Sequence, residues 1–412
     1  MSFIVNDQIV LLRAPEGPLA PYIASFSKWA IGQGYARCSL RQRVRIAAGF
    51  SRWLAEKSVR LRSVSSRHFV QYLRYRARRP RVCAGEATAL RQLFDFLRDQ
   101  RAIPPEKMRR IRLSPVEECT QAYSRYLREE RVLANATIVN YVPFVRKFLR
   151  DCFGSGPVLL SRLRAGDVVR FVQRRAPRLH LRTTKLLTTA LRSFLRYGRY
   201  CGDIRLDLAA AVPVVANWSM SSVPRAISPD QVLRLLARIN RRTAVGRRDY
   251  AILLLLARLG LRSSEVVFLE LEDIDWKDGS LSVRGKGGRR LQLPLPADVG
   301  EAIVAYVRHG RTPSNSRRVF LRAKAPFRGF LGPSAIGSIV RHALLRAGID
   351  APTTGAHQFR HGLATEMLRH GASLSEIGEL LGHRSPETTK IYTKVDLEAL
   401  RTLALPWPGG VR

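Results

Sequence analysis

Two residues near the end of the chain, His383 and Tyr392, are of types that could carry out chemistry on a phosphate. They lie in LGHRSPETTKIYTKV (381–395), where a Gly-His pair ends an apolar run. A tyrosine hydroxyl can attack a phosphorus atom, and a histidine can hold the phosphate. A helix-capping histidine and a core tyrosine would give the same local pattern. The choice between these explanations depends on what else the chain carries.

Four more basic residues precede this pair. Arg262 lies in GLRSSE, between two expected helices, and Lys286 lies on an expected Gly-rich turn. His357 and Arg360 are three residues apart, which places them on one face of a helix. A capping arginine, a turn lysine or a core histidine would explain any one of them. The ordered set of six points instead to a phosphate-binding active site.

These motifs together resemble the tyrosine recombinase or phage integrase family. The matching segments are GLRSSE (260–265), the hairpin RGKGGR (284–289), HQFRHGLAT (357–365) with the family's HxxR box, LLGH (380–383) and IYTKV (391–395). The likeness covers residues 228–396 almost continuously. A helical unit at 115–212 resembles the family's core-binding domain more weakly, and the first 110 residues are additional to a minimal member.

The resemblance implies a catalytic role for six residues. They are Arg262, Lys286, His357, Arg360, His383 and Tyr392. The two-pronged guanidinium of arginine suits the negative charge that a phosphodiester gains when it is attacked. A phosphotyrosyl ester conserves the energy of the broken phosphodiester bond, so no ATP is needed. The leaving 5′ hydroxyl needs a proton donor, and the resemblance gives that role to Lys286. The sequence contains no carboxylate cluster of metal-site type, so neither a metal nor a cofactor is expected.

Three neighbours of this set receive supporting roles. Glu265 follows Arg262 by three residues and is expected to orient one of the phosphate-binding groups. His361 and Arg384 lie beside the HxxR box and the Gly-His pair, and both are interpreted as structural or phosphate-contacting.

The charge of the chain favours a nucleic acid partner. Its 412 residues include 71 Lys and Arg against 32 Asp and Glu, a formal net charge of +39. This charge is spread along segments with globular composition, which favours double-stranded DNA over a membrane anchor. Solvated helix faces would also carry such charge. The predicted DNA contacts are Arg74, Arg76, Arg78, Arg79, Arg170, Arg174, Arg175, Arg178, Arg284, Arg289 and Arg384.

The cysteines and the apolar runs bear on the compartment. Five cysteines without a CxxC pattern indicate a reducing environment. AILLLLA (251–257) is too short to cross a bilayer, and the first residues lack the basic region of a signal peptide. The expected location is the cytoplasm, in association with the nucleoid.

The periodicity predicts a mainly α chain with a small antiparallel β-hairpin in an α+β catalytic domain. HFVQYLRYRA (68–77) parallels DVVRFVQRRA (167–176), and ATALRQLFDFL (87–97) parallels TTALRSFLRYG (188–198), which indicates a duplicated four-helix unit. The predicted boundaries are 1–112 for an extra SAM-like DNA-binding unit, 113–212 for the core-binding domain, 213–227 for a linker, 228–396 for the catalytic domain and 397–412 for a C-terminal helix or tail exchanged between protomers or packed on its own domain.

Local signals place several elements of the C-terminal half. Ser228 and Gln231 form a capping box, and Pro229 suits the first helical turn, so a helix starts here. Alternating residues on both sides of 285–288 predict the hairpin, VFLRA (319–323) is a candidate strand, and Ser373 is expected to cap the helix before His383.

The resemblance implies a site-specific recombinase or integrase. It would cut DNA through a 3′-phosphotyrosyl intermediate, pass through a Holliday junction, and act on a mobile element as a homo-tetramer or as a mixed tetramer with related recombinases. Three alternatives remain open: a relaxing topoisomerase of related chemistry, a catalytically silent partner in a recombinase set, and a basic structural protein of the nucleoid.

Overall fold

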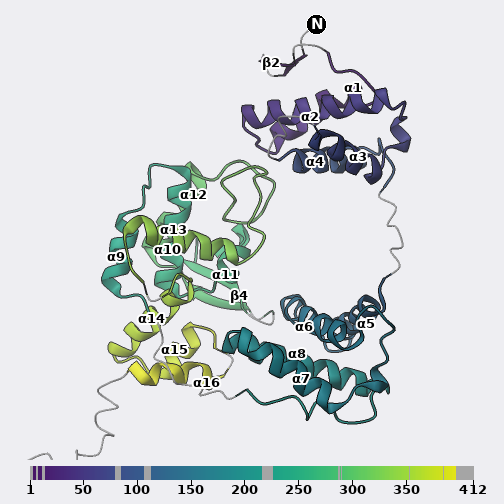
Figure 1. The fold of residues 1–412 in the computed structure, drawn as a ribbon. Coiled ribbons are helices and arrows are strands. Elements are labelled where there is room, and N and C mark those ends of the chain that lie inside the picture. The colour runs from purple at the N-terminus through teal and green to yellow at the C-terminus, as the bar shows by residue number, and fades with distance from the viewer. Residues whose placement is uncertain are drawn as a thin grey trace, which may run out of the picture. The chain divides into compact units, whose positions relative to one another are not determined.

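The computed structural model describes residues 3–5, 8–11, 14–78, 85–105, 113–215, 226–285, 288, 290–351, 353–383 and 385–395. These residues are mostly helical, with one two-stranded and one three-stranded antiparallel sheet (Figure 1). The prediction of a mainly α chain with a small antiparallel sheet in the C-terminal half is confirmed. By internal contacts the chain divides into two compact units, one formed by 1–107 with 222–412 and the other by 108–221.

The first helical unit consists of four helices behind a short hairpin. Its elements are β1 (Phe3–Val5), β2 (Gln8–Leu11), α1 (Ala20–Gly32), α2 (Arg37–Glu56), the 3-10 turn η1 (Leu61–Ser63), α3 (Ser66–Ala77) and α4 (Glu86–Asp99). Phe26, Phe50 and Trp53 are buried between these helices, and the ring of Phe50 packs against those of Trp53, Tyr72 and Phe94. This aromatic core gives the unit its own hydrophobic centre.

The second helical unit also has four helices with a 3-10 turn between the second and the third, and it has a further 3-10 turn before the fourth. It consists of α5 (Pro115–Glu129), α6 (Asn135–Phe153), η2 (Leu160–Arg162), α7 (Ala165–Arg175), η3 (Ala176–Arg178) and α8 (Leu181–Tyr200). Tyr123, Phe148 and Phe194 lie in its core. The matched segments of the sequence repeat fall on α3 with α7 and on α4 with α8, as duplication requires. Arg74 and Arg76 lie in the last turn of α3, and Arg174 and Arg175 lie in the last turn of α7.

The C-terminal half (226–395) contains the three-stranded sheet. Its elements are α9 (Pro229–Ala237), α10 (Ala244–Leu259), α11 (Ser263–Phe268), η4 (Leu271–Asp273), β3 (Ile274–Asp275), β4 (Ser280–Arg284), β5 (Arg290–Pro294), α12 (Ala297–His309), α13 (Ser334–Ala347), α14 (His357–Arg369), α15 (Leu374–Leu380), α16 (Pro386–Thr389) and η5 (Lys390–Val395). The strands pair antiparallel in the order β3-β4-β5.

Helix α10 is the centre of this half. Six consecutive residues, from Ala251 to Leu256, are buried, so this stretch of the helix is apolar on every side. It packs against α9, α11, α12, α13 and α14, and Figure 1 shows it in the middle of these helices. It ends at Gly260, whose φ of 59° lies in the left-handed region. The apolar run at 251–257 is thus part of a protein core, and across the described segments no helix is long and apolar enough to cross a membrane.

The local signals were mostly correct. The side chain of Ser228 accepts from the backbone N–H of Gln231, and Ser373 does the same for Glu376. Strands β4 and β5 pair from Ser280 with Pro294 to Arg284 with Arg290, which confirms the hairpin.

The strand predicted at 319–323 is wrong. Val319, Phe320 and Leu321 are all buried, so the segment lacks the alternation of a half-exposed strand. Its backbone groups do not form a strand ladder. The N–H of Leu321 donates to the Tyr306 hydroxyl, and Leu321 shares only an isolated β-bridge with Gly329. Four of the cysteines, Cys38, Cys119, Cys152 and Cys201, are free thiols. Cys83 lies outside the described residues.

Candidate active site

Arg360 is the most buried basic member of the predicted set. Its side chain lies one turn into α14, and the residue is only 5% exposed. The guanidinium donates to the carbonyl of Gly260 at 2.9 Å and to the carbonyl of Leu381. Burial and the nearby Arg262 guanidinium lower its pKa to about 10, so it remains protonated at neutral pH. A fixed cation is thereby held between two loops that are distant in sequence.

Arg262 lies on the first of these loops, at the N-cap of α11. Its backbone N–H and its Nη1 both donate to the carboxylate of Glu265, at 2.7 Å and 2.8 Å. Its Nη2 reaches the carbonyl of Gly382 at 3.4 Å. Glu265 is buried, so this carboxylate both caps the helix and fixes the arginine. That contact is the kind of support expected of Glu265 from the sequence.

Two glycines let these loops approach each other. Gly260 and Gly382 have φ values of 59° and 58°, which L side chains rarely adopt. A Cβ on Gly260 would lie 2.9 Å from a methyl carbon of Leu381. The glycines of GLRSSE and LLGH are therefore required by the backbone conformation, and at Gly260 by close packing as well.

His383 follows the second loop and is half-buried. Its Nδ1 lies 2.8 Å from the hydroxyl of Thr389, and Thr389 itself is buried. Burial lowers the pKa of His383 to about 4, and Arg360 and Arg262 add to the effect, so the ring is neutral at pH 7. If the Thr389 hydroxyl donates to Nδ1, the ring keeps its proton on Nε2. A neutral N–H donor of this kind suits a phosphate oxygen.

Tyr392 lies on η5 and is only 1% exposed. Its ring is nearly parallel to that of His383, at 7° and 6.5 Å between centroids. Its hydroxyl is 3.0 Å from Nδ1 of His361. Burial raises the pKa of Tyr392, while Arg360 and Arg262 act in the opposite direction. The phenol is therefore protonated at neutral pH, within the field of both arginines.

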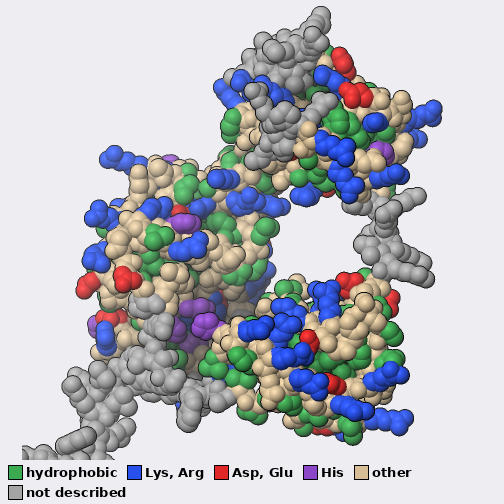
Figure 2. All heavy atoms as spheres, viewed as in Figure 1, with side chains coloured by type: hydrophobic (Ala, Val, Ile, Leu, Met, Phe, Trp, Pro, Cys, Tyr) green, Lys and Arg blue, Asp and Glu red, His purple; other side chains and the backbone are tan. Residues whose placement is uncertain are grey.

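Two members of the predicted set are less closely defined. His357 begins α14, and its ring centroid lies 6.5 Å from that of His361. Lys286 lies outside the described residues, in the stretch of sequence between Arg284 and Arg290. The described structure thus brings together Arg262, His357, Arg360, His383 and Tyr392. Figure 2 shows histidine side chains gathered on one face of the C-terminal half.

Sequence reasoning interpreted His361 as structural or phosphate-contacting and did not predict its contact with Tyr392. His361 directly follows Arg360, and its contact with Tyr392 spans 31 positions. The extra histidine in HQFRH was the available signal. Its spacing of four residues from His357 places both on one helix face, where either could have met the tyrosine.

Several predicted DNA-contact arginines already pair with acids. Arg76 pairs with Glu86, Arg174 with Asp151, and Arg284 with Glu270 and Asp273. Arg175 packs over the ring of Phe171. Arg170 lies on α7 and Arg178 on η3. Arg79, Arg289 and Arg384 lie outside the described residues.

Arg74 and Arg78 line a cavity of about 660 Å³ in the first helical unit. Lys57, Trp53 and Tyr75 line it too, so cations and aromatic rings share one concave surface.

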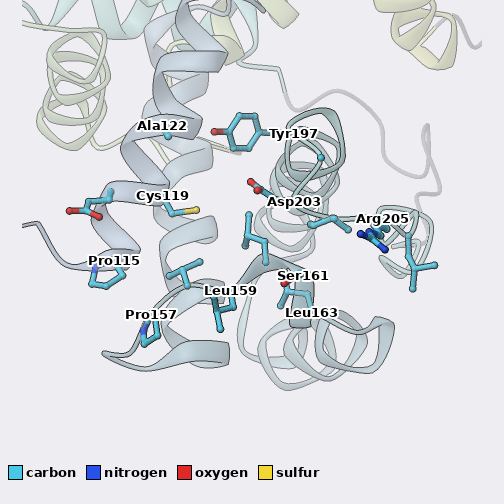
Figure 3. Close-up of a pocket in the computed structure, with 16 residues that line it drawn as sticks. Pro115, Cys119, Ala122, Pro157, Leu159, Ser161, Leu163, Tyr197, Asp203 and Arg205 are labelled. Atoms are coloured by element: carbon cyan, nitrogen blue, oxygen red, sulfur yellow. The ribbon is translucent and has the colours of Figure 1, made fainter.

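A larger cavity, of about 1,240 Å³, lies in the second helical unit (Figure 3). Cys119 on α5 lines it, as do Leu159 and Asp203 from two connecting segments. None of the predicted catalytic or DNA-contact residues lines this cavity. Within the described ranges, no group of three or more His, Cys, Asp or Glu side chains could hold a metal ion.

Comparison with known proteins finds the same family over both parts of the chain. The phage integrase family pattern matches residues 225–398, and the pattern of the phage integrase N-terminal SAM-like domain matches 120–199. A protein of Sinorhizobium fredii named as integrase/recombinase y4rA is 58% identical over 99% of both chains. The tyrosine recombinase XerA of Pyrococcus furiosus is 31% identical, over 69% of this chain and 92% of its own length.

Solved structures share the fold. XerH recombinase bound to its difH substrate aligns with a TM-score of 0.56 at 20% identity, over 71% of this chain and 88% of that one. A lambda integrase tetramer on a Holliday junction aligns with a TM-score of 0.52 at 17% identity, over 67% and 76%. The family patterns and the full-length relative establish that this chain belongs to the phage integrase family of tyrosine recombinases.

Proposed function

We propose that the protein is a site-specific DNA recombinase that cuts and rejoins strands through a 3′-phosphotyrosyl intermediate and a Holliday junction. The observation that carries this proposal is the hydrogen-bonded cluster around Arg360. One buried guanidinium contacts the loops that carry Arg262 and His383, and Tyr392 lies against the His383 ring. Such a cluster would hold a phosphate beside an oxygen nucleophile.

The arginines would bind the non-bridging oxygens of the scissile phosphate. The guanidinium of each arginine already donates a hydrogen bond to a protein oxygen, which would fix its orientation before DNA binds. A preorganised donor costs no rearrangement as charge develops in the transition state. His383 would add a neutral donor, and His357 would complete the phosphate-binding group.

The chemical step would exchange one ester for another. Tyr392 Oη would bond to phosphorus while the bond from phosphorus to the 5′ oxygen breaks. The 5′ alkoxide is a poor leaving group, and we assign its proton to Lys286 on the hairpin turn. The ester bond energy is kept, so a 5′ hydroxyl of a partner strand could reverse the step without ATP.

The partner in this proposal is duplex DNA with specific sites, bound by a homo-tetramer or by a mixed tetramer of related recombinases. Solved neighbours with the same fold include the lambda integrase tetramer and the Tn1549 transposon integrase with circular intermediate DNA. These neighbours support an assignment to integration, excision or transposition of a mobile element. Residues 1–112 and 113–212 would grip DNA, and 397–412 would pass to a neighbouring protomer.

The direct test is a nicked suicide duplex that carries the cognate site. Cleavage beside the nick releases a short fragment and traps the covalent complex, which survives detergent. The wild type should give this band, and Tyr392→Phe should not. A band that persists in Tyr392→Phe would remove Tyr392 from the active site.

Two further outcomes are informative. If both proteins bind the site tightly and neither forms the band, the result favours a silent partner in a recombinase set or a missing accessory factor. If the wild type forms the band and relaxes supercoiled DNA without joining two duplexes, strand relaxation replaces recombination as its function.

A further inference from the structure

Among the residues that the structure describes, His361 provides the hydroxyl of Tyr392 with a close polar neighbour of a kind that could accept its proton. That neighbour is Nδ1 of His361, at 3.0 Å. The ring centroids of the two residues are 5.7 Å apart. Tyr392 is buried, and His361 is half-buried on α14. The contact is therefore screened from bulk water, which would otherwise compete for the phenol proton.

Four other described groups of the site are poorly suited to receive that proton. Arg262 and Arg360 are protonated cations without a free lone pair. The Nδ1 of His383 already faces the Thr389 hydroxyl, and the carboxylate of Glu265 is engaged by Arg262. A neutral imidazole at His361 offers an unprotonated nitrogen at hydrogen-bond distance from the reacting oxygen.

The geometry points to His361 as the general base that takes the phenol proton from Tyr392 during strand cleavage. This inference rests on the proposed function and adds a catalytic residue to it. As Tyr392 Oη bonds to phosphorus, its proton passes to Nδ1 of His361. The bond from phosphorus to the 5′ oxygen breaks, and that oxygen takes a proton from the separate acid assigned to Lys286. In rejoining, His361 returns its proton to the departing phenolate.

The surroundings of His361 keep the ring neutral. Its charged and titratable neighbours in the described part of the chain are His357 and Arg360 on its own helix, Tyr392 on η5 and His383 after α15. Burial lowers the pKa of His361, and His357 and Arg360 lower it further. The ring can therefore accept a proton at pH 7, and it loses that capacity as the pH falls through its pKa, below 6.5.

Two substitutions separate a base from a merely positioning residue. His361→Asn keeps a hydrogen-bonding group near the position of Nδ1 but cannot be protonated, whereas His361→Ala removes both. We expect both variants to cleave a suicide duplex about 10²-fold or more slowly than the wild type in single-turnover assays. His370→Ala, at the exposed end of the same helix, is the matched control and should cleave normally. Full activity in His361→Ala, or normal cleavage by His361→Asn alone, would overturn the assignment.

The pH profile gives an independent signature. Without a base, only the phenolate form of Tyr392 can attack, so the rate of His361→Ala should keep rising with pH well above 8. The wild-type rate should be level there and fall only below pH 6.5. Parallel profiles for the two proteins would contradict the proposal.

A sulfur substrate distinguishes the base from the acid. Replacing the bridging 5′ oxygen by sulfur gives a leaving group that needs no proton. This substrate should restore cleavage to Lys286→Ala and should not restore it to His361→Ala. Rescue of His361→Ala would place His361 on the leaving-group side and overturn its assignment as the base. Failure of the proposed function is separate, because it would appear as a covalent band in Tyr392→Phe.

Discussion

At the scale of single residues, the site depends on how Arg360 is held. A buried guanidinium is stable only when its donors are satisfied, and here two main-chain carbonyls satisfy part of the fork. The remaining donors are directed by this anchoring and are available for a ligand. Lysine carries the same charge but has one nitrogen, so it cannot reach both carbonyls and a phosphate.

Arg360→Lys should therefore be nearly inactive. We expect suicide-duplex cleavage to fall by about 10²-fold or more, the usual loss when one preorganised donor is removed. The buried carbonyl left without a partner should also lower the free energy of unfolding, by about 1–3 kcal/mol. Arg369→Lys, exposed at the end of the same helix, should match the wild type in both respects. Cleavage within threefold of wild type in Arg360→Lys would exclude this role for Arg360.

At the scale of elements, the ends of α10 and α15 bring the two arginines and His383 together. Gly260 ends α10, and Gly382 follows α15; both adopt left-handed backbone conformations. The loop after α10 carries Arg262, and the loop after α15 carries His383. The site thus lies where two helices end. A change in the backbone at either helix end would displace Arg262 or His383.

Gly260→Ala should show this dependence. The alanine would have to keep the positive φ of this position, which costs about 1–2 kcal/mol. Its methyl group would press on Leu381 at 2.9 Å, which adds about 1–3 kcal/mol. Gly348→Ala is a matched control, because its φ of 63° is similar and no atom lies within 4 Å of the new carbon. Denaturant unfolding should show the larger loss for Gly260→Ala. Equal losses would mean that the contact with Leu381 is unimportant.

The elements show why sequence reasoning succeeded and where it stopped. Capping signals at Ser228 and Ser373 are local, and both helices begin as predicted. The strand predicted at 319–323 failed because its backbone bonds go to a tyrosine hydroxyl and to loops that only the tertiary fold supplies. His361 was missed as a partner of Tyr392 for the same reason, since their contact depends on how η5 returns to α14.

At the scale of the whole molecule, the net charge of +39 is only partly available to DNA. Arg76 and Arg174 form ion pairs with acidic neighbours, which partly neutralise their charge. Arg74 and Arg78, by contrast, line a cavity that they share with Lys57 and two aromatic rings. DNA affinity should therefore depend on particular arginines more than on their total number.

Salt titration of binding can test this. Each phosphate contact contributes about 0.9 to the slope of log affinity against log salt. Replacing Arg74 and Arg78 together by alanine should make the slope shallower by about 2. Arg174→Ala, which removes an arginine already paired with Asp151, should change it less. An unchanged slope in the double variant would remove this cavity from the DNA interface.

The two carbonyls that hold Arg360 also bear on how the protein tolerates sequence change. A main-chain carbonyl remains as a hydrogen-bond acceptor after any substitution that preserves the local backbone. Side chains around the site can therefore change while Arg360 keeps these hydrogen bonds. Mutational sensitivity should then concentrate at the few positions that shape the backbone, Gly260 and Gly382 above all. Members of a lineage could drift widely in their surrounding residues while the geometry of this phosphate-binding group stays constant.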